Sequence, residues 1–99
     1  MILELSGKQK RFLQALGNSL KTIVSDGKSG VTDNTLVSVR NAFNTKELIK
    51  IKIQDGCEEV KEDVAVKIHR GTEAALVQII GRTILLYKPN KDHPKIELP

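Results

Sequence analysis

The spacing of the apolar residues predicts three amphipathic helices. Apolar side chains that recur every three or four positions fall on one face of an α-helix. Three sets have this spacing: Phe12, Leu13, Leu16 and Leu20; Leu36, Val39 and Phe43; and Val60, Val64 and Ile68. Ser6 opens a Ser-x-x-Gln capping box for the first helix, and Thr32 is the expected N-cap of the second. Gly71 is expected to end the third helix, at 57–72.

Four further segments have the pattern or the composition of β-strands. The short segment 21–25 is rich in β-branched residues. The segment ELIKIKIQ alternates strictly, with isoleucines on one face and Lys50, Lys52 and Gln54 on the other, which predicts a strand with one solvated face. The segments AALVQII and TILLYK are two more strands. The Gly81-Arg82 pair between them is typical of a hairpin turn.

The order of these elements, α-β-α-β-α-β-β, predicts an α/β fold of the two-layer α+β type with a four-stranded mixed sheet. Strand–helix–strand connections favour parallel pairing and right-handed crossovers, whereas the final hairpin must be antiparallel. Two such crossovers place the second and third helices on one face, and a sheet of this width accommodates about two helices. The first helix is then expected at an edge of the sheet or on its other face.

The segment DGKSGVTD, at 26–33, follows the first strand and has three interpretations. Its Gly-Lys-Ser triplet matches the end of a nucleotide-binding G-x-x-x-x-G-K-[ST] motif, but the first glycine of that motif would fall at Thr22. An ordinary turn from strand to helix is the second interpretation. The third is a G-x-x-G clamp on a nucleic-acid backbone. In a clamp, Gly27 and Gly30 allow close approach, Lys28 supplies charge, and the next helix presents N–H groups to a phosphate.

The topology predicts that basic residues from distant parts of the chain converge on this loop. The first helix is expected to run antiparallel to the first strand, because the link between them is short. If the third strand is parallel to the first, the hairpin turn lies at the same end of the sheet, where open α/β sheets bind ligands. The residues expected to converge are Lys8, Lys10, Arg11, Lys28 and Arg82. The three in the first helix oppose its macrodipole, which favours a role in binding over one in stability.

The length and charge of the chain narrow the class of partner. The 99 residues suffice for a single domain, with a folded core at about 3–89 and a polar tail at 90–99 that we expect to be loosely held. The net charge of +4 arises in residues 1–56, which contain nine Lys/Arg and five Asp/Glu, whereas 57–99 contain seven of each. This asymmetry indicates an anionic partner. No apolar run approaches the ~20 residues of a membrane span, so we expect no membrane association.

Few residues are candidates for catalysis or for metal binding. The single cysteine, Cys57, cannot form an internal disulfide, which points to a reducing cytoplasm. Cys57, His69 and His93 do not have the spacing of metal ligands, and His69 is expected to be structural or solvated. No catalytic triad or carboxylate pair stands out, and three aromatic residues are too few for a base-stacking platform. We therefore expect that the protein is not an enzyme and that it binds no cofactor, metal or small-molecule substrate. We also expect it to be a monomer.

Three motifs occur together in this chain: G-K-x-G after the first strand, L-I-K-I-K in the second, and I-G-R-T-I-L-L-Y at the closing hairpin. With the basic first helix SGKQKRFLQAL, this combination resembles the bacterial YhbY-type proteins, the stand-alone form of the CRM domain (chloroplast RNA splicing and ribosome maturation). The resemblance covers about residues 3–89. It implies a fold like the C-terminal domain of translation initiation factor three with an added N-terminal helix. It also implies RNA binding without catalysis, in association with precursors of the large ribosomal subunit.

The resemblance carries over to particular positions of this chain. It implies contacts to ribosomal RNA from two sets of residues: Lys8, Lys10 and Arg11 in the first helix, and Gly27, Lys28, Ser29 and Gly30 in the loop. Lys50, Lys52 and Arg82 are expected to make further contacts. Two positions depart from the family pattern, since Asp26 replaces an apolar residue and Lys46 an arginine. The alternative is a protein-interaction module on the pre-ribosome whose basic face binds an acidic partner.

Overall fold

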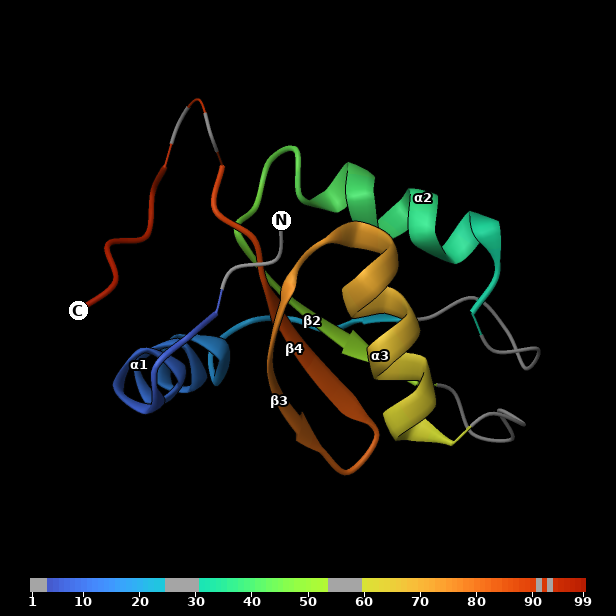
Figure 1. Ribbon diagram of the computed structural model, residues 1–99, viewed down its shortest axis with the longest axis horizontal. Helices are drawn as coiled ribbons and strands as arrows, with labels where there is room; N and C mark the ends of the chain where they lie inside the picture. The colour runs from blue at the N-terminus through green and yellow to red at the C-terminus, as the bar shows by residue number, and fades with distance from the viewer. Residues whose placement is uncertain (1–3, 25–30, 54–59, 91, 93) are drawn as a thin grey trace.

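The computed structural model describes residues 4–24, 31–53, 60–90, 92 and 94–99. Figure 1 shows a central sheet with helices packed on both of its faces. The elements follow the predicted order: α1 (Gly7–Gly17), β1 (Ile23–Val24), α2 (Asp33–Ala42), β2 (Leu48–Lys52), α3 (Lys61–Thr72), β3 (Ala75–Ile80) and β4 (Thr83–Tyr87).

Side-chain caps begin α1 and α2 where the sequence predicts them. The Ser6 hydroxyl accepts a hydrogen bond from the Gln9 N–H at 3.1 Å, and the Gln9 side chain accepts one from the Ser6 N–H at 3.0 Å. Thr32 and Thr35 form the same reciprocal pair at the start of α2, at 3.3 and 3.2 Å. These bonds satisfy N–H groups that have no partner inside the helix.

The end of α3 differs from the prediction, because Gly71 lies inside the helix. Glu73 ends α3 instead, in the left-handed conformation with φ 58°. Gly71 serves a different purpose, since a Cβ placed there would lie 2.7 Å from Cδ2 of Leu36 in α2. The Arg40 guanidinium donates to the Gly71 carbonyl at 2.6 Å across the same contact. The glycine therefore permits the close packing of α3 against α2.

The strands form one mixed sheet in the order β1-β2-β4-β3. β1 pairs parallel to β2, and β4 pairs antiparallel to both of its neighbours, so β1, β2 and β3 point the same way. The register aligns Val24 with Lys52, Lys52 with Thr83, and Thr83 with Ile80. We call this row, where β1 and β3 end, the carboxyl edge of the sheet. The turn that joins β3 to β4 lies there, with Gly81 at φ 56°.

The two faces of the sheet carry separate apolar clusters. Ile49, Ile51, Ile84 and Leu86 pack beneath α2 and α3, which lie on one face as predicted. Leu13 of α1 packs on the other face, in the cluster with Leu48, Val77, Leu85 and Tyr87. Of the two placements that the sequence allows for α1, the structure therefore has the one on the opposite face.

This placement of α1 corrects the prediction that the lysine face of β2 is solvated. Leu48 on that face is buried beneath α1, and Lys50 is half-buried. The Lys50 ammonium donates to the Gly17 carbonyl of α1 at 3.2 Å. Lys52 is exposed. The alternation therefore identifies the two faces correctly, but the amino-terminal half of the lysine face is covered.

The tail is held more firmly than the sequence predicts. The buried Glu47 carboxylate accepts hydrogen bonds from the N–H groups of Asn90, Lys95 and Ile96, at 2.7, 2.5 and 2.8 Å. Ile96 and Leu98 pack against the cluster beneath α1. The prediction of a loosely held tail is therefore wrong for residues 94–99.

The charge of Glu47 depends on these contacts. Burial opposes its ionisation, but the three N–H groups and the nearby Lys95 charge outweigh burial, so the pKa of Glu47 lies below its ordinary value. Burial, followed by the Glu47 charge, raises the pKa of Tyr87. The ionised carboxylate is thus the form that binds the tail.

Candidate nucleic-acid interface

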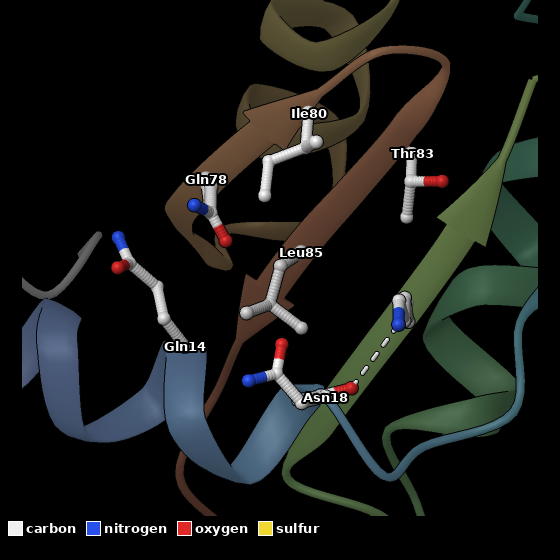
Figure 2. Close-up of a pocket in the computed structure, with 8 residues that line it drawn as sticks. Gln14, Asn18, Gln78, Ile80, Thr83 and Leu85 are labelled. Carbon is white, nitrogen blue, oxygen red and sulfur yellow. Dashed lines mark hydrogen bonds between the residues drawn. The ribbon is translucent and has the colours of Figure 1, made fainter.

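α1 runs across the strands, which contradicts the predicted antiparallel alignment with β1. It contacts β3, β4 and β2. Figure 2 shows Gln14 near Gln78 of β3, and Asn18 near Leu85 of β4. Gly17 lies one turn after Gln14 in α1, and its carbonyl accepts a hydrogen bond from the Lys50 ammonium of β2. Residues 18–22 then carry the chain past β2 to the outer strand β1, so a short link is compatible with a crossing helix.

A close contact fixes this crossing. A Cβ on Gly17 would lie 2.9 Å from Cδ2 of Leu85, so a larger residue at this position would require the Leu85 side chain to shift. Gly17 and Leu13 are the buried residues of α1. The rest of the helix is half-buried or exposed, which leaves its polar side chains available to a ligand.

The three basic residues of α1 are exposed and lie in its first half, away from the Gly17–Lys50 hydrogen bond to β2. Lys10 and Arg11 precede Gln14 by one turn and continue the row of side chains that contains Gln14 and Asn18. Lys8 does not belong to this row. β1, which precedes the predicted loop, is the outer strand at the opposite edge of the sheet, and outer strands of a four-stranded sheet are about 14 Å apart. The basic residues of α1 therefore lie across the sheet from the end of β1.

Part of the predicted site lies at the carboxyl edge of the sheet. β3 is parallel to β1, so the condition for bringing Arg82 to the end of β1 is met. Lys52 and Arg82 are both exposed there. The predicted loop residues come after β1 in the sequence and lie outside the described residues: Gly27, Lys28, Ser29 and Gly30.

A cavity of about 170 Å³ lies between α1 and the carboxyl half of the sheet. Its polar lining comes from Gln14 of α1, Asn18 at the C-cap of α1, Gln78 of β3 and Thr83 of β4. Leu85, Ile80, Gly17 and Lys50 complete the wall. Sequence reasoning missed these amides because nothing in the local pattern places α1 above this part of the sheet.

A second, more open groove of about 530 Å³ runs between the carboxyl half of α1, the start of β2 and the tail. Its apolar surface includes Leu16, Leu20 and Ile96. Four lysines line it as well: Lys21, Lys46, Lys50 and Lys95. No local pattern predicts this groove, because long-range hydrogen bonds from Lys95 and Ile96 to Glu47 and the packing of Ile96 and Leu98 bring the tail beside α1.

Other chemistry is not supported by the part of the chain that is described. No group of His, Cys, Asp and Glu side chains there is arranged to hold a metal ion. His69 has a structural partner, since its Nδ1 is hydrogen-bonded to the Ala74 carbonyl just beyond α3. No helix among the described residues is both long and apolar enough to cross a membrane.

The chain matches the CRS1 / YhbY (CRM) domain over residues 5–88. This match covers most of its length, and the chain belongs to the CRS1 / YhbY (CRM) domain family. The resemblance inferred from the three motifs is thereby confirmed.

Individual relatives are similar along nearly the whole chain. The Bacillus subtilis protein named probable RNA-binding protein YqeI is 46% identical over 95 residues, which cover 96% of this chain and 99% of its own. A Haemophilus influenzae protein named RNA-binding protein is 42% identical over 95 residues, covering 96% of this chain and 95% of its own. The solution structure of the hypothetical protein SAV1595 from Staphylococcus aureus superposes with a TM-score of 0.81 at 33% identity, covering 97% of this chain and all of that one.

Proposed function

We propose that this protein binds RNA through the phosphate backbone. The observation that carries the proposal is the sheet topology, which brings the ends of β1 and β3 to one edge, where Lys52 and Arg82 are exposed. Family membership and the names of the relatives support the same function. The excess positive charge of residues 1–56 suits a polyanionic partner.

The proposed contacts fall into two groups. The first comprises the loop and the start of α1: Gly27, Lys28, Ser29, Gly30, Lys8, Lys10 and Arg11. The second comprises Lys50, Lys52 and Arg82. Within it, Lys50 is the weakest candidate because its ammonium already donates to Gly17. A single strand that crosses the sheet from α1 to the end of β1 would meet the basic residues of α1 first, then Arg82 and Lys52, and then the loop that follows β1.

The RNA in this proposal is ribosomal RNA in precursors of the large subunit. Family membership supports this step of the proposal. In the proposal, the protein acts in the cytoplasm during ribosome assembly, without a catalytic step or a cofactor. Phosphate contacts hold a protein on RNA but do not read its sequence. The backbone contacts alone therefore leave the choice of RNA site to other features of the surface.

A second candidate function is a protein-interaction module that binds an acidic partner. The groove with four lysines favours it, because exposed Leu16 and half-buried Leu20 add apolar surface beside the positive charge. Such a partner would need both apolar and acidic side chains.

Filter binding with bare ribosomal RNA fragments separates these functions. We expect the purified protein to retain RNA fragments without any other protein, and polyglutamate of matched charge to compete poorly. Lys28→Ala should weaken binding to every fragment by a similar factor, about two- to fivefold, as expected for an exposed ion pair. If polyglutamate competes as well as RNA does, the acidic-partner function replaces the proposal.

A further inference from the structure

Four polar side chains line the cavity between α1 and the sheet without being used in hydrogen bonds among the described residues. Gln14 lines it from α1, Asn18 from the C-cap of α1, Gln78 from β3 and Thr83 from β4. Within the described ranges, the side chains of these four residues make no hydrogen bond to one another or to the rest of the protein. Each amide offers both donors and an acceptor. The cavity therefore presents hydrogen-bonding groups of both kinds to a ligand.

A β-bulge places Gln78 in this cavity. Leu76 is opposite Leu86 and Gln78 is opposite Leu85, so Val77 is an extra residue in β3. In a regular strand Gln78 would share a face with Leu76, which packs toward α2 and α3. The bulge turns the Gln78 side chain to the α1 side, next to Val77. Bulges often redirect a side chain in this way beside a functional site.

The rest of the wall suits a flat ring with polar edges. Leu85 and Ile80 supply aliphatic surface, on which the face of a ring can pack. Gly17 contributes no side chain, which keeps the space open. The Lys50 ammonium lies at one end, and its bond to the Gly17 carbonyl uses one of its three donors.

The cavity has room for a single six-membered ring. A protein cavity of about 150 Å³ admits benzene, and this one has about 170 Å³. A pyrimidine base has one six-membered ring, whereas a purine has a second fused ring. Uracil and cytosine also share an O2 carbonyl that an ammonium or an amide can bind.

We propose that this cavity binds an unpaired pyrimidine base of single-stranded RNA, an inference that rests on the RNA binding proposed above. Gln14, Asn18 and Gln78 hydrogen-bond the edge of the base, and Leu85 and Ile80 pack against its face. The cavity adjoins the carboxyl edge, so Lys52 and Arg82 lie where they can bind the flanking phosphates. The site supplies the base preference that backbone contacts cannot provide.

Fluorescence anisotropy with four RNAs of equal charge tests the inference. The probes are oligo(U), oligo(C), oligo(A) and an oligo(U) with abasic positions, each about 12 nucleotides long, within the usual range of single-strand sites. We expect oligo(U) and oligo(C) to bind at least about fivefold tighter than the other two, which is the usual effect of one hydrogen bond. Gln78→Ala and Gln14→Ala should remove this preference while leaving binding of the abasic RNA unchanged.

Asn41→Ala is the matched control, because it removes an exposed amide from α2 on the other side of the sheet. It should keep the full pyrimidine preference. A second measurement, independent of any variant, follows the side-chain NH₂ signals of Gln14, Asn18 and Gln78 in wild-type protein titrated with uridine 5′-monophosphate. We expect these signals to shift more than that of Asn41.

The outcomes of these experiments distinguish a failure of the base site from a failure of the proposed RNA binding. Equal affinity of wild-type protein for all four RNAs would overturn the base site and leave RNA binding intact. Binding to none of them would overturn both. Unmoved Gln14 and Gln78 signals in the titration, with a pyrimidine preference present, would show that the preference arises elsewhere.

Discussion

At the scale of single residues, two helical glycines act as contact points between elements. Gly17 brings α1 against Leu85 of β4, and Gly71 brings α3 against Leu36 of α2. Glycine inside a helix costs about 0.5–1 kcal/mol relative to alanine. The closer packing of each helix on its neighbour offsets that cost. A bare backbone at Gly17 also opens the cavity that we assign to a base.

Gly17→Val should therefore destabilise the protein by about 1–3 kcal/mol, the usual cost of overpacking a core. The matched control is Ala15→Val, which introduces the same β-branched residue at an exposed position of the same helix. Urea unfolding of the two variants measures the difference between their free energies of unfolding. Equal stability of the two would show that α1 does not need close contact with β4.

Lys50 and Lys52 show what a residue pattern can and cannot predict. Alternation in β2 places both on one face, and the structure agrees. The pattern contains no information on which part of that face another element covers. Only the packing of Leu13 and Gly17 reveals that Lys50 is covered and bonded to α1, while Lys52 remains exposed.

At the scale of elements, the existence and order of the helices and strands were predictable from the sequence. The crossing of α1 over the sheet and the attachment of the tail were not. Caps and apolar spacing identified the helices, because these signals are local. The crossing angle of α1 depends on long-range contacts of Gly17 and Leu13, which no local signal encodes. The attachment of the tail depends on Glu47, which lies more than 40 residues away from its partners in the sequence. An isolated carboxylate before a strand gives no sign of such a role.

Glu47→Gln should loosen the tail. The amide keeps one acceptor oxygen but loses the charge and the second oxygen, so we expect a loss of about 1–2 kcal/mol of unfolding free energy. Hydrogen exchange of the Lys95 and Ile96 amides should accelerate, whereas exchange in α3 should change little. Unchanged exchange at both amides would contradict the assigned role of Glu47.

The same contact predicts a dependence on pH. The folded-state pKa of Glu47 lies below its ordinary value, so its contribution to stability is complete above about pH 4.3 and is lost as the pH falls through the folded-state pKa. The stability difference between the wild type and Glu47→Gln should accordingly shrink on acidification. Urea unfolding at neutral and acidic pH measures it, and a difference that grows on acidification would contradict the sign.

At the scale of the whole molecule, the topology predicted from element order is what assembles the surface. Parallel β1, β2 and β3 give a single carboxyl edge, and this followed from the two crossovers and the hairpin. The position of the basic residues of α1 did not follow, because it depends on the crossing of α1 over the sheet. The loop from Gly27 to Gly30 stays a prediction. The exposed Lys10 and Arg11 of α1, with Arg82 and Lys52 at the carboxyl edge, form a strip of positive charge, and the base-sized cavity lies beside it.

The salt dependence of RNA binding tests this strip most directly. Each neutralised phosphate of a single strand contributes about −0.7 to the slope of log K against log salt concentration. Lys10→Ala with Arg11→Ala should therefore flatten the slope by up to about 1.4, whereas Lys67→Ala with Arg70→Ala removes the same two charges from exposed positions on α3 and should leave it nearly unchanged. Equal flattening by the two pairs would mean that RNA is held by diffuse charge attraction and that the strip is not a binding surface.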